Sequence, residues 1–174
     1  MSASHERHSI ATRALLLAFT TAVILLNARV LGASGQGEIA WIQLGILVVT
    51  GVSGFLAGGA VVYLQKEIPL RDMLLPGHTW LVISALLGTW GGISAGFLPA
   101  EHFVAMAGLG WLQGAIIFHS QLLLADHRIR QHNVLQMLQG GLLLAGLIVA
   151  FFGMQMKSVE AFIGALAVSL CITA

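Results

Sequence analysis

Residues 39–64 read IAWIQLGILVVTGVSGFLAGGAVVYL, a run of 26 residues without a charged side chain. A helix needs about 20 mostly apolar residues to cross the hydrocarbon core of a bilayer. The whole chain of 174 residues is 57% hydrophobic and only 9% charged. A soluble domain carries about 25% charged residues, and disordered chains are poor in apolar ones, so both classes are excluded. The sequence predicts an integral membrane protein.

Further apolar runs lie on both sides of this segment, and those at 79–98, 103–125 and 134–156 carry no charge. They are longer than the strands of a membrane barrel, which have about ten residues of alternating hydrophobicity. Lipid offers backbone groups no hydrogen-bond partner, so each run is expected to be helical. The sequence predicts an all-α integral membrane fold, a six-helix transmembrane bundle in which residues 1–174 form a single transmembrane lobe. The expected helices are 14–31, 39–64, 79–98, 103–125, 134–156 and 159–174.

The basic residues predict the orientation of these helices. If the N-terminus is cytoplasmic, only Arg29 and Lys157 of the eight lysines and arginines lie outside. Because cytoplasmic loops carry the excess of basic residues, the N-terminus and the loop 66–76 are expected inside. The sixth run, 159–174, reaches roughly 24 Å at 1.5 Å per residue, less than the hydrocarbon core. We therefore expect the sequence to be the front part of a longer protein.

Polar side chains within the expected helices predict a substrate cavity. Arg13, Thr20 and Asn27 are spaced by seven residues and so lie near one face of their helix. Gln136 and Gln139 lie on the helix 134–156. The candidate cavity residues are Arg13, Thr20, Asn27, Arg29, Gln136 and Gln139. The alternatives are hydrogen bonds that only join helices, and arginines that extend to the nearer headgroup layer.

Small residues at four-residue spacing predict close helix packing. Such spacing occurs at Gly54 and Gly58, at Gly110 and Gly114, and at the four positions Ser84, Gly88, Gly92 and Gly96. The composition favours neither an enzyme nor a nucleic-acid-binding protein, since the net charge is +1 and no catalytic or phosphate-binding motif is present. No metal and no cofactor are expected, because the chain has one cysteine and no zinc-binding pattern.

Two stretches resemble a known family. Asn27-Ala28-Arg29-Val30-Leu31-Gly32 followed by Gly35-Gln36-Gly37-Glu38-Ile39-Ala40 is similar to the junction between the first two helices of bacterial polysaccharide (O-antigen type) flippases. The stretch 121–139, with its leucines, short basic loop and paired glutamines, is similar too. The family belongs to the multidrug/oligosaccharidyl-lipid/polysaccharide exporter superfamily.

The resemblance implies a function and a location. Family members have two lobes of helices around a central cavity and move undecaprenyl-diphosphate-linked oligosaccharides across the cytoplasmic membrane by alternating access. This sequence would be the N-terminal lobe, with the lipid-linked oligosaccharide, the bilayer, and a missing second lobe or second copy as its partners. Two alternatives stay open: a membrane scaffold subunit that does not transport, and a drug or cation exporter of the same superfamily.

Overall fold

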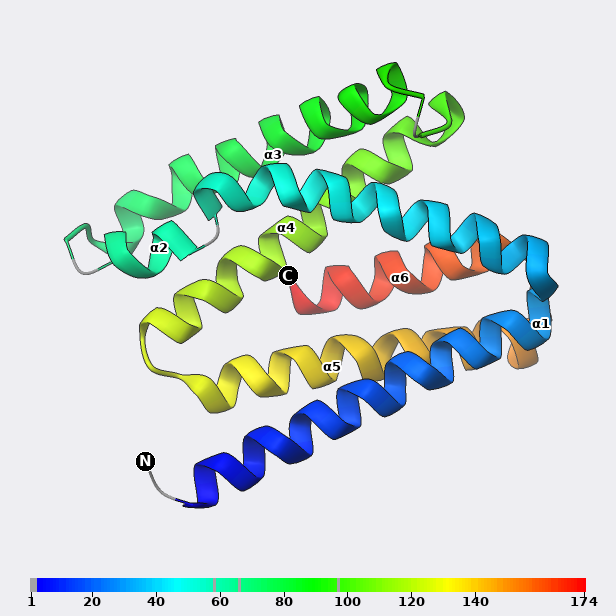
Figure 1. Cartoon of the computed structure of the whole chain (residues 1–174), viewed down its shortest axis with the longest axis horizontal. Coiled ribbons are helices and arrows are strands. Elements are labelled where there is room, and N and C mark those ends of the chain that lie inside the picture. The colour runs from blue at the N-terminus through cyan, green and yellow to red at the C-terminus, as the bar shows by residue number, and fades with distance from the viewer. Residues whose placement is uncertain (1–2, 58, 66, 97) are drawn as a thin grey trace. The chain divides into compact units, whose positions relative to one another are not determined.

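A computed structural model describes residues 3–57, 59–65, 67–96 and 98–174, with side chains described from residue 10 onward except for 55–59. The fold is all-helical: helix makes up 89% of it, and no strand occurs in those ranges. The expected all-α class is confirmed, and the number of α-helices matches. In chain order they are α1 (Ala3–Ala57), α2 (Gly59–Leu64), α3 (Leu70–Ser94), α4 (Phe103–Ala125), α5 (Ile129–Ile148) and α6 (Val159–Thr173) (Figure 1).

A single glycine divides α1 into two helical arms. Gly32 has φ 71° and ψ −171°, a backbone conformation that is not helical and that glycine alone adopts readily. The first arm therefore ends at residue 31, where the apolar run 14–31 ends. The second arm begins at residue 33 and not at 39, because the stretch after Gly32 is helical and one residue is enough to break the helix.

The third helix begins earlier than the sequence suggests. The loop expected at 66–76 ends at Pro69, and α3 starts at Leu70 instead of 79. Pro69 precedes the helix with φ −57°, and Asp72 in the first turn complements the positive end of the helix dipole. Pro76 lies inside the helix, so it did not mark a boundary. At the other end α3 stops at Ser94 and not at 98, and Gly96 has φ 74° just beyond it.

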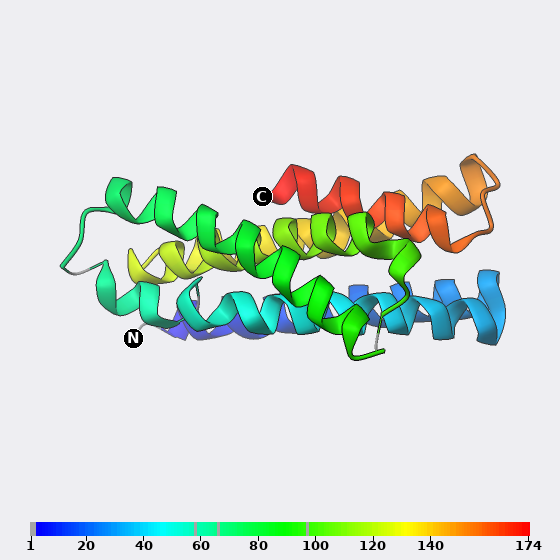
Figure 2. The same ribbon diagram turned by 90° about the horizontal axis from the view of Figure 1, so that it is seen from above.

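Of the next two helices, one matches its expected range and the other differs from it at both ends. The range 103–125 coincides with α4, which follows a short 3-10 turn at Ala100–His102. The helix expected at 134–156 begins at Ile129 as α5 and continues into a π-helix, Val149–Gly153. Polar residues such as Arg130 are tolerated in its first turn because they are exposed. Figures 1 and 2 show α6 lying alongside α5.

Within the described residues, four helical segments are long and apolar enough to cross a membrane. They are Ile10–Gly54, Leu70–Ser94, Ala100–Ala125 and Ile129–Gly153, and the shorter apolar helix Val159–Thr173 follows. The first has 45 residues, about twice the length that one crossing needs, and Gly32 lies near its middle. Length and composition of these helices are those of a membrane protein.

The helices form two compact units. The first contains the chain up to Ile39 together with Ile129–Thr173, and the second contains Ala40–Arg128. In the second unit α1, α3 and α4 approach closely at glycines. A Cβ atom placed on Gly88 would lie 3.1 Å from the Cα of Val49, and one on Gly114 would lie 2.9 Å from Leu81 Cδ2. Gly110 is likewise pressed against the Val49 side chain. The predicted packing role is confirmed for these three glycines, whereas Gly92 contacts Leu98 of the segment that follows its own helix.

The same prediction is wrong for two other glycines. Gly96 has open space around it and serves the positive φ after α3, a conformation that costs glycine no Cβ clash. Gly54 also has nothing within 4 Å of its Cβ position. Gly58 lies outside the described residues. The four-residue spacing therefore identified helix faces made of small residues, but it did not show which glycines on those faces contact another helix.

Candidate functional site

The polar residues expected to line a cavity all lie in the first unit, on the first arm of α1 and on α5. These two segments meet at Gly140, where an added Cβ would lie 3.4 Å from Phe19 Cδ2 and 3.8 Å from Leu16 Cδ2. Arg13 and Thr20 are one turn on either side of Leu16, and Gln136 is one turn before Gly140. The contact therefore brings these three polar residues to the flanks of one helix pair.

Thr20 has its hydroxyl satisfied within its own helix. The side chain is exposed, and its Oγ1 donates to the carbonyl oxygen of Leu16 at 2.9 Å. Thr79 on α3 makes the same bond to Leu75, also at 2.9 Å. Such bonds are common for threonine in helices and leave an oxygen lone pair free to accept a further bond. Thr20 can thus face a polar ligand without needing another helix as its partner.

Asn27 is the buried member of the set. Its side chain is 1% exposed, and its Oδ1 accepts no hydrogen bond from the described residues. A buried acceptor without a donor costs about 1–3 kcal/mol. Asn27 precedes Gly32 by little more than one helical turn. In this conformation it is therefore enclosed by protein and does not lie on an open wall.

The other members of the set are accessible to different degrees. Arg13 and Arg29 are exposed, whereas Gln136 and Gln139 are half-buried. Arg29 lies three residues before Gly32, at the end of the first arm of α1. The six residues therefore fall into two groups. Arg13, Thr20 and the glutamines lie along the contact between α1 and α5, and Asn27 and Arg29 lie beside the helix break.

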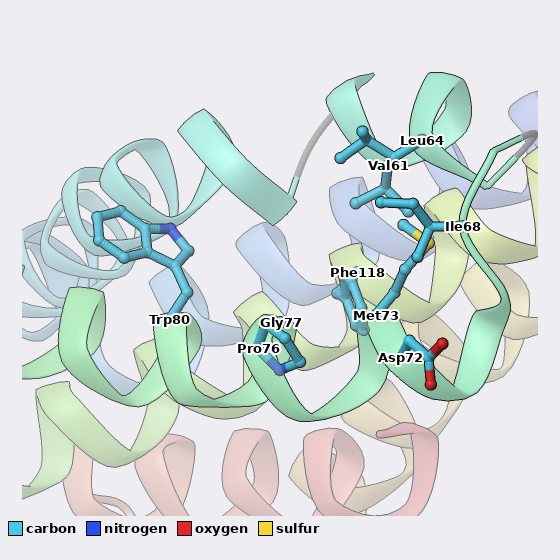
Figure 3. A pocket seen from close by; sticks show the side chains of 9 residues that line it. All are labelled: Val61, Leu64, Ile68, Asp72, Met73, Pro76, Gly77, Trp80 and Phe118. Atoms are coloured by element: carbon cyan, nitrogen blue, oxygen red, sulfur yellow. The ribbon is translucent and has the colours of Figure 1, made fainter.

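A cavity that the sequence did not predict lies in the second unit. It has a volume of about 220 Å³ and lies between α2, α3 and α4 (Figure 3). Its walls are almost entirely apolar, with one acidic residue. The lining residues are Val61, Leu64, Ile68, Asp72, Met73, Pro76, Gly77, Trp80 and Phe118.

One wall of this cavity depends on Gly77, a residue of α3 without a side chain. A Cβ on Gly77 would lie 2.6 Å from Cζ of Phe118, so the ring of Phe118 packs directly on α3. Phe118 is 1% exposed and belongs to the buried cluster that also contains Val61, Met73, Leu81 and Ala115. His78 and His119 stack edge-on beside it, with ring centroids 5.3 Å apart. The rings stiffen this end of the α3–α4 pair.

The sequence does not predict this cavity, because residues 66–76 have the composition of a loop, whereas those from Leu70 onward are helical. The available signal was the Pro76-Gly77 pair close to His78, which removes a backbone donor and a side chain from one helix turn. The cavity can hold a hydrocarbon group. If that group carries a polar substituent, the Asp72 carboxylate can accept hydrogen bonds from the substituent.

A second hollow of about 410 Å³ lies in the first unit along α5, the π-helix and α6. Its lining consists of small and apolar residues with Glu160, and it includes none of the six predicted cavity residues.

Comparison with known proteins identifies no relative: no family model matches the chain, and neither a curated protein nor a solved structure matches it.

Proposed function

We propose that this membrane protein takes part in moving an oligosaccharide linked to undecaprenyl diphosphate across the bacterial cytoplasmic membrane. In this proposal the chain provides an N-terminal lobe, its N-terminus is cytoplasmic, and the product supplies surface polysaccharide synthesis. A second lobe or a second copy would complete the transport path.

The observation that carries the proposal is the backbone of Gly32. In the resembling family the motif Ala28-Arg29-Val30-Leu31-Gly32 stands at the junction of the first two helices. Here Gly32 divides the apolar segment Ile10–Gly54 of α1 into two arms of about 22 residues each, and each is long enough for one crossing. The second resembling stretch, 121–139, contains the turn between α4 and α5, where His127 has φ 56°. Helix junctions at these two stretches are what supports the proposal.

The charge on Arg29 supports an anionic substrate. A diphosphate that crosses the membrane must be paired, because burying an unpaired charge costs several kcal/mol. A guanidinium can bind phosphate through two parallel hydrogen bonds, and Arg29 is exposed and available for such contacts. In the proposed orientation Arg29 lies near the outer end of its helix. The positive-inside rule places basic residues on the cytoplasmic side, so it does not explain an arginine at this position.

The polar flanks of the α1–α5 contact support a sugar-bearing ligand. Arg13, Thr20 and Gln136 lie within one helical turn of the residues that make this contact, and hydroxyl, amide and guanidinium groups are suitable partners for a polyhydroxylated molecule.

The proposal is tested by deleting the gene in the bacterium that carries it. We expect loss of surface polysaccharide together with accumulation of the lipid-linked oligosaccharide, whose amount is measured by mass spectrometry after lipid extraction. Loss of polysaccharide without any accumulation would contradict transport and favour the scaffold alternative. Unchanged polysaccharide combined with increased sensitivity to cationic drugs would contradict the proposal and would favour the drug-exporter alternative.

A further inference from the structure

The cavity between α2, α3 and α4 opens at one end of a membrane-spanning helix. Asp72 lies in the first turn of α3, and the candidate span begins at Leu70. The apolar lining residues Val61 and Met73 are buried, at 2% and 8% exposure. In Figure 3 the Met73 side chain extends from α3 toward Val61 and Ile68, and the Asp72 carboxylate lies apart from this apolar group. The cavity therefore combines a hydrocarbon interior with a charged mouth at the level of the membrane surface.

Two side chains of opposite charge, Arg71 and Asp72, lie together in the first turn of α3, and Asp72 lines the cavity. Arg71 Nε lies 3.4 Å from Asp72 Oδ1, and the two side chains are 85% and 55% exposed. An ion pair this exposed is weak, since solvent screens it and side-chain entropy opposes it. Arg71 and Asp72 can therefore separate, and each can pair instead with the opposite charge of a ligand that carries both signs.

We propose that this cavity is a binding site for a phospholipid with an ethanolamine headgroup. One acyl chain occupies the space among Val61, Met73 and Phe118. The lipid phosphate pairs with the Arg71 guanidinium, and the primary ammonium donates to the Asp72 carboxylate. The inference is independent of the transport proposal, because its residues lie in the other unit.

The same chemistry separates this lipid from the alternatives. A choline headgroup has no N–H group, so it cannot donate a hydrogen bond to Asp72. A glycerol headgroup leaves a net negative charge beside the carboxylate, which like-charge repulsion disfavours. Ethanolamine alone among the three provides both a donor for Asp72 and charge neutrality at the mouth.

Trp80 makes the site measurable. It lines the cavity, and its indole Nε1 donates to the carbonyl oxygen of Ser53 at 3.2 Å, which holds the ring in place. Bromine atoms on a lipid acyl chain quench a tryptophan only at contact. A variant that keeps Trp80 and replaces Trp41, Trp90 and Trp111 by Phe therefore reports an acyl chain inside the cavity.

The matched control keeps a different tryptophan on the same helix. Trp90 is 64% exposed and lies away from the cavity, so a Trp90-only variant reports the surrounding bilayer. Both variants are purified as the full chain and placed in phosphatidylcholine bilayers. Acyl-brominated phosphatidylethanolamine, phosphatidylcholine or phosphatidylglycerol is then added at increasing mole fraction.

We expect Trp80 to be quenched by the ethanolamine lipid at roughly fivefold lower mole fraction than by the choline lipid, which corresponds to one modest ionic contact. Trp90 should respond equally to all three lipids. Asp72→Asn should abolish the preference, and Val61→Phe, which fills the cavity, should reduce Trp80 quenching by every lipid. Equal quenching of Trp80 by the three lipids would overturn the proposal, as would a preference for the glycerol lipid or one that survives in Asp72→Asn.

Discussion

The hydroxyl oxygens of Ser53 and Ser84 lie 2.7 Å apart, buried between the second arm of α1 and α3. Each hydroxyl also lies within hydrogen-bonding distance of a carbonyl oxygen of its own helix, Ser53 of Val49 at 3.0 Å and Ser84 of Leu81 at 3.1 Å. Each hydroxyl has a single proton, so at most two of the three contacts are hydrogen bonds at one time, and the bond between the serines forms when one of them donates to the other. The pair is a polar link between two helices at the position where glycines on α4 bring a third helix close.

We expect this link to contribute modestly to stability. Hydrogen bonds between membrane helices average about 0.6 kcal/mol in double-mutant cycles, because the separated helices find other partners. A cycle with Ser53→Ala and Ser84→Ala should therefore give a coupling of about that size and of stabilising sign. Unfolding of the purified chain in mixed micelles measures it. A coupling of zero would show that the two hydroxyls act independently.

Gly88 and Gly91 provide a sharper test of the helix packing. A Cβ on Gly88 would lie 3.1 Å from the backbone of Val49, whereas Gly91 has nothing within 4 Å. Because backbone cannot move aside as a side chain can, Gly88→Ala should destabilise the chain by about 1–3 kcal/mol. Gly91→Ala should be neutral or stabilising by up to about 1 kcal/mol, since alanine is the better helix former. The same micelle unfolding assay compares the two variants, and equal effects would refute the close approach of α3 to Val49.

The backbone at Gly32 predicts an unusual intolerance to substitution. Its φ of 71° and ψ of −171° fall in a region that is nearly restricted to glycine, so Gly32→Ala should cost about 1–3 kcal/mol. Asparagine should not rescue the loss, because it tolerates the left-handed helical region and not this one. Gly37→Ala, at a helical glycine with open space, is the control. A Gly32→Ala variant as stable as Gly37→Ala would mean that α1 is not broken at this residue.

The sequence located the helix break and several close contacts because these depend on local chemistry. Gly32 ends an apolar run, and Gly88, Gly110 and Gly114 fall at four-residue spacing. The predicted start of α3 was wrong because Arg71, Asp72 and Pro76 are typical of loops, whereas here the two charged residues lie in the first turn and Pro76 lies inside the helix. The π-helix Val149–Gly153 has no distinct apolar period, so nothing in the sequence separated it from α5.

The candidate sites show a similar division. The seven-residue spacing predicted one face for Arg13, Thr20 and Asn27, but the burial of Asn27 depends on tertiary packing that a helical wheel does not contain. The cavity at Asp72 arises only when α2, α3 and α4 meet, since its residues come from three separate elements. Sequence spacing within one helix cannot predict such a space.

The proposed orientation predicts which loops are reached from outside the cell. Met73, expected in a cytoplasmic loop, is buried in α3, so Arg71 is the better position for labelling. Single cysteines at Arg71 and Arg128 in a Cys171→Ser background should not react with an impermeant thiol reagent in intact cells. Cysteines at Glu38 and Glu101, both exposed, should react. All four should react after permeabilisation, and the reverse pattern in intact cells would invert the proposed topology.

The transport proposal depends most directly on Arg29. The measurement is the fraction of lipid-linked oligosaccharide that an impermeant reagent reaches from the periplasmic side, compared in strains that carry the wild-type protein, Arg29→Ala or Arg29→Lys at equal protein levels. We predict a fraction near that of the gene deletion for Arg29→Ala and an intermediate fraction for Arg29→Lys, because lysine keeps the charge but loses the paired hydrogen bonds. A wild-type fraction in the Arg29→Ala strain would contradict a role for this arginine in moving the diphosphate.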